Sequence, residues 1–418
     1  MVVRWMARPW RSSCVSGWIL LGLGMPGAVR ALAPEWTQVA GMPTSRQYLA
    51  AGAINGRILA VGGWGSGSSG TVATLEEYDP AIDGWRARAL MPTGRAGPGA
   101  GVVNGKLYVI GGVNRYNAPL PNNEEYDPGS DTWTVRAPCP TPRESPAVGV
   151  VNGRIYAIGG WDPAPGALSV VEAYDPVTNT WQTRTSLTTS PRATAATAVV
   201  NGIIYVIGGY RLGAVLGCVD AYDPSTDTWT TKAPKPTACW GSAAGVVDGL
   251  VYTIGGDTGG LDAVATVEVY DPASNTWTTG NPLPAPRYDH AAAVVGCAVY
   301  AIGGNDGWVK GLSTVYRGHV LDCEPPPPPP YTGPIRVFPN PFQRDRAVRG
   351  TVKFEGIPAG AALRLHTVRG VRVWKTESMG AMVEWDGKSA GGGPVSPGVY
   401  LWVVDDRGKQ STGKLVVE

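Results

Sequence analysis

Histidine and phenylalanine are scarce in this chain. Three of each occur among 418 residues, and only 16% of the residues are charged. The low charge, with 58 glycines and 37 prolines, argues against a coiled coil or a disordered chain and favours a turn-rich all-β protein. The sequence also contains no P-loop, nucleophile elbow or zinc motif, so no short motif indicates an enzyme class.

An unbroken apolar run long enough to span a membrane is also missing. The segment Val15–Val29 is interrupted by glycines and a proline, follows Arg4, Arg8 and Arg11, and leads into small residues. This pattern predicts a secretory signal peptide at residues 1–31 rather than a membrane anchor. We therefore expect a secreted or cell-surface protein with no transmembrane segment in the mature chain.

The chain lacks a strong charge of either sign. It has 35 basic and 33 acidic residues, and the predicted signal peptide contains four arginines and no acid. The mature chain is therefore slightly acidic, and nothing in its charge indicates nucleic acid or an anionic membrane as a partner.

One unit of sequence, exemplified by Val102–Trp133, organises most of the chain. Asn104-Gly105 separates two short apolar runs and predicts a hairpin with a type I′ turn. Gly111-Gly112 ends the second run, and the segments "EEYDP" and "DTWTVRA" then predict two further strands. Each unit is thus expected to be a four-stranded antiparallel meander.

The unit occurs six times. The glycine pairs recur at intervals of 47 to 49 residues, each followed by a tyrosine and, in five copies, by a tryptophan. The pairs and tyrosines are Gly62-Gly63 and Tyr78, Gly111-Gly112 and Tyr126, Gly159-Gly160 and Tyr174, Gly208-Gly209 and Tyr222, Gly255-Gly256 and Tyr270, and Gly303-Gly304 and Tyr316.

The period, the glycine pair, the tyrosine and the tryptophan resemble the kelch repeat. The resemblance implies a six-bladed kelch β-propeller over residues 32–324. Trp36 stands where a fourth strand would place it, with no earlier strands of its unit, and the sixth unit has Cys323 in place of its tryptophan. We therefore expect an N-terminal strand to complete the last blade and close the ring.

Composition changes after Cys323. A proline-rich segment at residues 325–334 predicts a semi-rigid linker, and all three phenylalanines follow it. Residues 335–418 contain about seven short strand patterns and predict a small β-sandwich.

Within that sandwich, "VFPNPF", "EWDG", "SPGVYLWVV" and "GKLVVE" resemble the Ig-like domain of flagellar hook-capping proteins and the C-terminal sorting domains of type IX secretion cargo. The resemblance implies a sorting or anchoring domain that contacts secretion machinery. The alternative is a plain spacer or surface-binding sandwich.

Candidate binding residues gather on one face of the predicted propeller, where the first strand of each blade begins and the second ends. An arginine stands sixteen residues before five of the six glycine pairs, and aromatic or polar residues follow the pairs in the variable loops. Aromatic faces with fixed polar groups suit a glycan or protein ligand. The candidates are Arg46, Arg95, Arg143, Arg192, Arg287, Trp64, Arg115, Tyr116, Trp161, Asp162, Tyr210, Arg211, Trp240, Asp257, Asn305, Asp306 and Trp308.

The arginines have a structural alternative, because they belong to the kelch pattern and can bond loop carbonyls or nearby acids. His290 likewise matches the pattern and is more typical of framework than of a ligand-binding residue. Function is then expected in the loop residues that vary between blades.

Enzymatic alternatives find little support. A copper radical oxidase would need two tyrosines and two histidines at one metal, whereas His290 and His319 are predicted at opposite ends of blade six. A reaction like that of sialic acid mutarotases needs only acids and arginines, for which Asp257, Asp306 and Arg287 are candidates. We expect neither a metal nor another cofactor.

Five cysteines remain after the predicted signal peptide, so at least one is unpaired. Cys297 and Cys323 fall on the same face of the last blade and are predicted to form a disulfide. Cys218 and Cys239 fall on the opposite face of adjacent blades and could form a second bridge, leaving Cys139 as a thiol.

The sequence thus predicts an exported, monomeric, non-catalytic binding module that recognises a glycan or protein through its loops. A carbohydrate-active enzyme and a structural envelope or adhesion component are the two alternatives.

Overall fold

The structure, a computed structural model, describes residues 34–320 apart from 67–69, 188, 261, 309 and 310, together with the strands and some adjoining residues of 336–417. The chain divides into two compact units, Met1–Cys323 and Glu324–Glu418. The expected signal peptide and proline-rich linker lie outside the described residues. The described part contains strands and no helix, and hence no helix that could cross a membrane.

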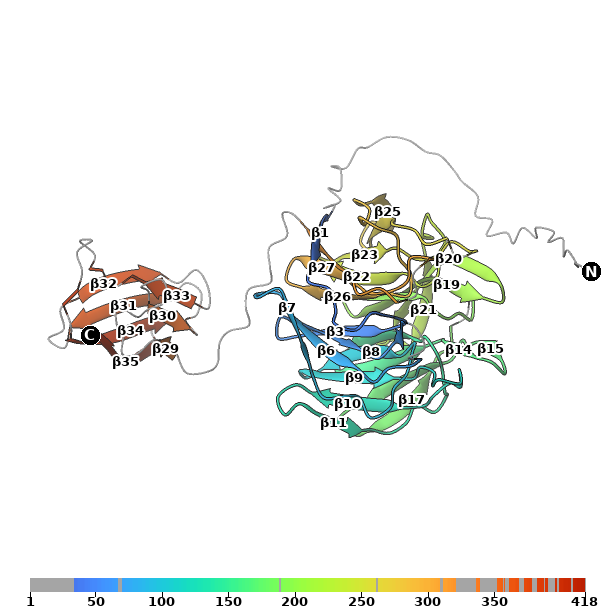
Figure 1. The fold of residues 1–418 in the computed structure, drawn as a ribbon, viewed down its shortest axis with the longest axis horizontal. Coiled ribbons are helices and arrows are strands. Elements are labelled where there is room, and N and C mark those ends of the chain that lie inside the picture. Colours follow the sequence, from blue (N-terminus) through green and yellow to red (C-terminus); the bar gives the residue numbers. More distant parts are fainter. Residues whose placement is uncertain are drawn as a thin grey trace, which may run out of the picture. The chain divides into compact units, whose positions relative to one another are not determined.

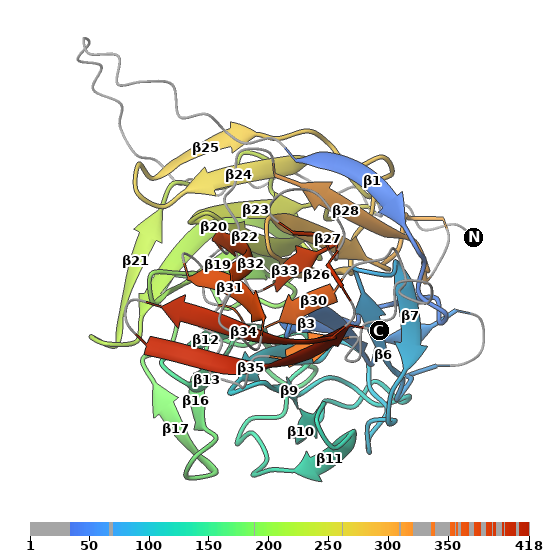
Figure 2. The same ribbon diagram turned by 90° about the vertical axis from the view of Figure 1, so that its left-hand side faces the viewer.

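The described part of the first unit forms six four-stranded antiparallel sheets, which Figure 2 shows arranged in a ring. The first unit is therefore a six-bladed β-propeller, as the repeat predicted. The blades, each from its inner to its outer strand, are β3 (Ala50–Ile54), β4 (Arg57–Val61), β6 (Leu75–Asp79) and β7 (Gly84–Ala87); β8 (Gly99–Val103), β9 (Lys106–Ile110), β10 (Asn123–Asp127) and β11 (Thr132–Val135); β12 (Ala147–Val151), β13 (Arg154–Ile158), β16 (Val171–Asp175) and β17 (Thr180–Arg184); β18 (Ala196–Val200), β19 (Ile203–Arg211), β20 (Ala214–Asp223) and β21 (Thr228–Lys232); β22 (Ala243–Val247), β23 (Leu250–Ile254), β24 (Val267–Asp271) and β25 (Thr276–Thr279); and β26 (Ala291–Val295), β27 (Ala298–Ile302), β28 (Val315–His319) and β1 (Glu35–Val39).

The N-terminal strand closes the ring, as predicted from Trp36. Strand β1 pairs antiparallel with β28, with Glu35 opposite His319 and Val39 opposite Val315. In Figure 2 the blue β1 lies beside the orange β28. The last blade is therefore built from both ends of the propeller sequence, and β1 covers the outer edge of β28.

The repeat tryptophans and tyrosines connect the outer strands of each blade to the segment that leads into that blade from the preceding one. Trp133 Nε1 donates a hydrogen bond of 2.8 Å to the carbonyl of Ala89, and the Tyr126 hydroxyl donates to Asp131, which in turn accepts from the Ala89 amide. Trp36 makes the same type of bond, 2.9 Å to the carbonyl of Asn281. The equivalent tryptophan bonds in the other blades are made by Trp85, Trp181, Trp229 and Trp277.

The inner strands pack closely around the axis. A Cβ atom on Gly149 of β12 would lie 2.8 Å from the side chain of Ile204 in the next blade, so only glycine fits there. Apolar clusters fill the spaces between neighbouring blades; one joins Leu59 and Val61 of the first blade to Leu107 and Tyr126 of the second. This packing gives the propeller a core that runs around the ring.

A ring of six backbone hydrogen bonds encircles the axis just before the inner strands. Each blade supplies one residue with φ between 48° and 62°, whose amide donates to the carbonyl of the preceding blade's residue at 2.7 to 3.2 Å. The bond from Tyr48 to Asp289 joins the first blade to the sixth at 2.8 Å. We call these six residues the axial ring: Tyr48, Gly97, Ser145, Thr194, Gly241 and Asp289.

Blade four departs from the expected meander. Strand β19 does not end at its glycine pair but continues to Arg211 through an irregularity between Ile207 and Gly209, and pairs with the long β20. Shorter pairs occur in the loops of blades one and three, namely β2 (Arg46–Gln47) with β5 (Trp64–Gly65), and β14 (Trp161–Asp162) with β15 (Gly166–Ala167).

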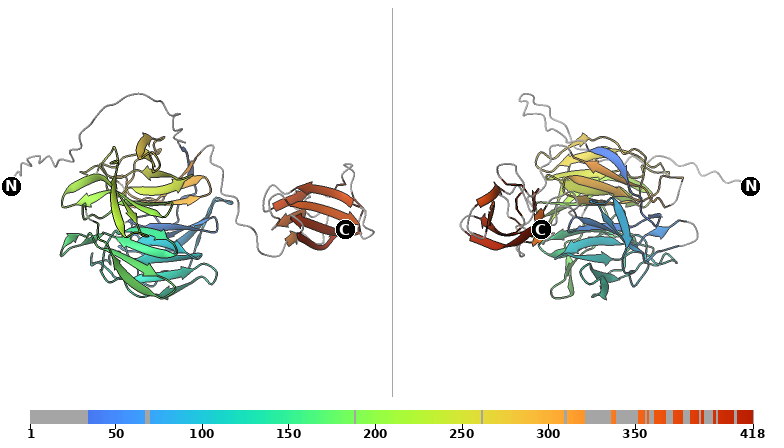
Figure 3. Two further views of the ribbon diagram at one scale, coloured as in Figure 1. Left: turned by 180° about the vertical axis from the view of Figure 1, so that it is seen from behind. Right: turned by 60° about the vertical axis from the view of Figure 1, so that its left-hand side comes forward.

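The second unit consists of two antiparallel sheets, whose strands are drawn in Figures 1 and 3. Both sheets contribute to one core, with Phe354 and Trp385 from one sheet and Leu363, Trp402 and Leu415 from the other. The unit is therefore a β-sandwich. Its sheets are β29 (Arg336–Phe338), β30 (Val352–Glu355) and β33 (Met382–Trp385), and β32 (Arg372–Glu377), β31 (Ala362–Thr367), β34 (Gly398–Asp406) and β35 (Lys409–Val417).

Candidate functional site

The repeat arginines lie inside the blades. Arg46 is fully buried, and its guanidinium donates to the carbonyls of Ala60, Gly62 and Thr74 and to Glu76 at 2.9 Å. Burial lowers the pKa of Arg46 to about 10, so it remains charged at neutral pH. The five arginines are at most 2% exposed, which removes them from any surface that a ligand could contact. The corresponding ion pairs in the next three blades are Arg95–Glu124, Arg143–Glu172 and Arg192–Asp220.

Blades five and six vary this ion pair. Cys239 replaces the arginine in blade five, and the buried Lys235 lies 2.5 Å from Glu268 instead. Blade six has Thr314 in place of the acid, and there Arg287 lies over the Tyr316 ring at 4.4 Å and bonds the Thr314 carbonyl. In each of the first five blades the buried repeat acid is met by a buried cation, as a structural role requires.

Six short β-bridges surround the loop face, which we define as the face where the loops after the glycine pairs emerge. In each bridge the residue after the glycine pair meets the residue after the arginine position, as Trp161 meets Glu144 with backbone bonds of 2.8 and 2.9 Å. The bridges present varied side chains at fixed positions. The pairs are Trp64 and Gln47, Val113 and Ala96, Trp161 and Glu144, Tyr210 and Ala193, Asp257 and Trp240, and Asn305 and Tyr288.

A pocket of about 530 Å³ opens among these bridges. Its size lies within the range of small-ligand sites. Four half-buried aromatic residues line it, and three of them, Trp161, Tyr210 and Trp240, come from blades three, four and five. We call it the loop-face pocket; its lining is Tyr48, Glu144, Ser145, Trp161, Ala193, Thr194, Tyr210, Gly213, Val215, Trp240, Gly259 and Gly260.

The aromatic rings of this pocket pack against one another and against the buried Tyr288. The ring centroids of Tyr210 and Trp240 are 6.1 Å apart, and those of Trp240 and the buried Tyr288 are 5.2 Å apart. Such contacts fix the orientation of flat apolar surfaces, which are then available for stacking against a ligand.

Trp161, Tyr210 and Trp240 are the sequence-predicted residues that line this pocket. Arg115 lies over its neighbour Tyr116, with the guanidinium carbon 4.7 Å from the ring centroid, while Trp308 is 94% exposed.

Several of the polar candidates stabilise the loops to which they belong. Asp162, Asp257, Asn305 and Asp306 each accept a hydrogen bond from a backbone amide two residues ahead. Arg211 reaches Ser190 at 3.4 Å, and Trp64 pairs with Gln47 in the β2–β5 bridge.

Nine of the twelve lining residues were not predicted from the sequence, and Tyr48 and Glu144 have the largest side chains among them. Both follow a repeat arginine within two residues, so they could be read as framework. The available signal was the size of the Tyr48 side chain, because the equivalent position in the other blades holds smaller residues such as Gly97 and Thr194. The position of Glu144 varies in type between blades, from Ala193 to Trp240.

A buried polar group lies beside the pocket on the propeller axis. Asp289, in the axial ring, is 6% exposed and hydrogen bonds Tyr48, but its Oδ2 atom has no partner within the described structure. Burial raises the pKa of Asp289 well above its usual value, and the charges of Glu144 and Asp257 raise it further.

Because this raised pKa favours the neutral carboxyl, Asp289 contributes most stability below its unfolded-state pKa, and that contribution is lost as pH rises through the folded-state value. Asp289→Asn keeps the size of the side chain and tolerates its φ of 51°. We expect it to raise the free energy of unfolding at pH 7 by about 1 kcal/mol, with a smaller gain at pH 4. Urea unfolding at both pH values measures this; Asp248→Asn, on an exposed turn and with the same φ of 51°, is the control. A gain that is equal at both pH values would contradict the assignment.

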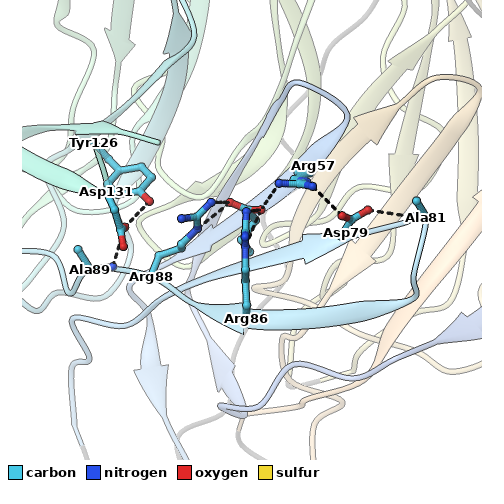
Figure 4. Close-up of polar contacts among 9 residues, drawn as sticks. Arg57, Asp79, Ala81, Arg86, Arg88, Ala89, Tyr126 and Asp131 are labelled. Carbon is cyan, nitrogen blue, oxygen red and sulfur yellow. Dashed lines mark hydrogen bonds and ion pairs between the residues drawn. The ribbon is translucent and has the colours of Figure 1, made fainter. Parts of the chain in front are cut away.

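A separate charged cluster lies at the outer strands of blade one. Figure 4 shows Arg57, Arg86 and Arg88, which all contact the carboxylate of Glu77 at 3.3, 2.5 and 2.7 Å. Arg57 also contacts Asp79 at 2.9 Å. Glu77 is only 3% exposed, so these cations compensate a buried acid, and we assign the cluster a structural role.

The predicted bridge between Cys218 and Cys239 is wrong, since both residues are thiols. Each thiol is engaged within its own blade: Cys218 accepts a hydrogen bond of 3.0 Å from Arg192, while Cys239 occupies the buried arginine position of blade five. Cys139 is also a thiol, and burial raises its pKa to about 12. Cys297 is disulfide-bonded, and its predicted partner Cys323 lies outside the described residues.

Four-stranded blades, closure by an N-terminal strand and the repeated Arg–acid and Tyr–Trp contacts define a kelch β-propeller. The chain belongs to the Attractin/LZTR1 beta-propeller family, whose model matches residues 86–313. The kelch motif itself matches residues 45–89.

Comparison with solved structures supports the same fold. A structure titled "Structure of YjhT" has a TM-score of 0.59 and 17% sequence identity, covering 66% of this chain and 95% of that one. At this identity the likeness concerns the fold alone. The search of curated proteins gave no significant match.

Proposed function

We propose that this protein is an exported, non-catalytic binding module that recognises a saccharide through the loop-face pocket. The observation that carries the proposal is the lining of that pocket, where Trp161, Tyr210 and Trp240 present ring faces around a volume of about 530 Å³. Sugar rings have apolar faces that stack on aromatic side chains, and a concave site of this size suits a small ligand better than a flat protein surface.

The mutarotase-like alternative loses two of the three groups on which it depended, Arg287 and Asp257, while Asp306 is half-buried. Arg287 is fully buried and bonded to the Gly303 and Thr314 carbonyls, and Asp257 is also fully buried. An acidic sugar would therefore meet neither of these residues. The geometry favours recognition without turnover.

The double variant Trp161→Ala, Tyr210→Ala tests the proposal on a glycan array. We expect the array signal of the wild-type protein to fall about tenfold or more, because buried aromatic anchors carry most of the energy of a binding site. Trp308→Ala is the control, since that side chain is 94% exposed and lies outside the pocket lining. Undiminished binding by the double variant, or a protein ligand with no glycan signal, would reject the proposal; turnover of a bound sugar would reject its non-catalytic part.

The second unit is proposed to sort or tether the propeller at the cell surface. Its support is the resemblance of its sequence to sorting domains and its own compact core of both sheets. Deleting residues 331–418 is expected to leave the propeller folded but to remove it from the surface, as measured by antibody labelling of intact cells. Unchanged surface display would reject the sorting role.

A further inference from the structure

The loop-face pocket has a negative charge without a positive one. Glu144 is the acidic residue of its lining, which contains no lysine, arginine or histidine. Within the described residues the Glu144 carboxylate has no hydrogen bond or ion pair, and burial raises its pKa. The buried repeat acids are each met by a cation, as Arg143 meets Glu172. Glu144 differs from them, because no cation of the described residues contacts it.

A second acidic residue, Asp257, lies at this end of the axis. It is fully buried, and its Oδ2 atom has no hydrogen-bond partner in the described structure. Both Glu144 and Asp257 act on Asp289 electrostatically. The low dielectric of buried surroundings makes such interactions stronger than in water. A negatively charged ligand would therefore be repelled.

The aromatic lining is suited to the opposite charge. Trp161, Tyr210 and Trp240 carry negative potential on their ring faces, and a cation placed over such a face is attracted to it. A carboxylate beside several aromatic faces is a recurrent composition for binding an ammonium group.

We propose that the ligand of the loop-face pocket is a sugar with a free amino group, whose ammonium pairs with Glu144 while its ring stacks on the aromatic side chains. This inference rests on the proposed saccharide-binding function and narrows it to a cationic class. Glu144 then serves as the specificity-determining residue, and Trp161, which is bridged to it through the backbone, positions the sugar ring.

A bare metal ion fits this site less well than an ammonium group. Calcium and magnesium need about six oxygen ligands, and the lining supplies only one acidic side chain. No group of three or more His, Cys, Asp or Glu residues suitable for a metal occurs in the described part of the chain. The aromatic residues would contribute nothing to a hydrated metal ion, whereas they stabilise an organic cation.

Isothermal titration of the full mature chain with three oligosaccharides of equal length tests the inference. The probes are a glucosamine oligomer, its N-acetylated form and a galacturonate oligomer, at a pH where the amine is charged. We expect the glucosamine oligomer to bind about tenfold tighter than the N-acetylated form, and the galacturonate oligomer to bind weakest.

The variant Glu144→Gln separates the charge from the shape of the pocket. We expect it to remove the preference for the amine while retaining binding of the N-acetylated oligomer. Glu384→Gln, in the second unit and with its side chain 45% exposed, is the matched control and should keep the wild-type preference.

Two results would overturn the inference. Equal affinity of the wild-type protein for the amine and N-acetylated oligomers would reject the cationic class but leave saccharide binding intact. A preference that survives in Glu144→Gln would reject the role of Glu144. Absence of binding by all three oligomers, combined with an empty glycan array, would instead reject the saccharide function itself.

Discussion

Replacing Arg143 with methionine is expected to lower the free energy of unfolding by about 3–5 kcal/mol, the typical cost of removing one partner from a buried ion pair. Methionine fills much of the space but leaves the buried Glu172 without its cation. The carbonyls of Ala157, Gly159 and Val170 lose their donor as well. Because a folded protein is stable by only about 5–15 kcal/mol, the variant should unfold at a much lower urea concentration.

Two further variants isolate the cause. Arg57→Met removes an arginine whose side chain is 44% exposed, and we expect a loss below about 1 kcal/mol. Arg143→Met combined with Glu172→Met should recover part of the stability, because no unpaired charge then remains. If Arg143→Met costs no more than Arg57→Met, the structural role of the repeat arginines is wrong.

Deletion of residues 34–39 is expected to remove most of the stability of the propeller. Strand β1 supplies the outer strand of blade six through five paired residues, and Trp36 packs against the core between the last two blades. Its loss exposes the edge of β28 and opens a ring whose blades support one another. Circular dichroism should show a broad thermal transition at lower temperature, and gel filtration should show association through the exposed edge.

The matched control for this deletion is Thr37→Ala, which keeps the backbone pairing with Arg317 and removes only a peripheral hydroxyl. We expect it to unfold like the wild-type protein. A sharp transition at the wild-type temperature after the deletion would show that the strand is not required for closure.

The fold could be predicted because each recurring residue of the repeat has a defined structural role. The Asn104-Gly105 turn adopts φ values of 50° and 73°, and the hydrogen bond from Trp133 to Ala89 links each blade to the preceding connection. The missing sixth tryptophan and the additional Trp36 indicated the closing strand in the same way. The turn depends on adjacent residues and the tryptophans recur at a fixed spacing, so both signals can be recognised without knowledge of the tertiary structure.

The candidate site was predicted only in part. Trp161, Tyr210 and Trp240 follow the glycine pairs or the arginine position, and the strand directions sufficed to place them on one face. Tyr48 joins them because ring closure brings blade one opposite blades three to five, which no local pattern reveals. Glu144 joins them through its backbone bridge to Trp161 in blade three. The predicted cysteine bridge failed because position 239 points into its own blade.

The most direct test of the account is a crystal structure of the full mature chain bound to an oligosaccharide that scores on the glycan array. The account predicts a sugar ring in the loop-face pocket, stacked on Trp161 or Trp240 with a polar group near Glu144. A sugar bound elsewhere, whether at the Glu77 cluster of blade one or on the second unit, would contradict it.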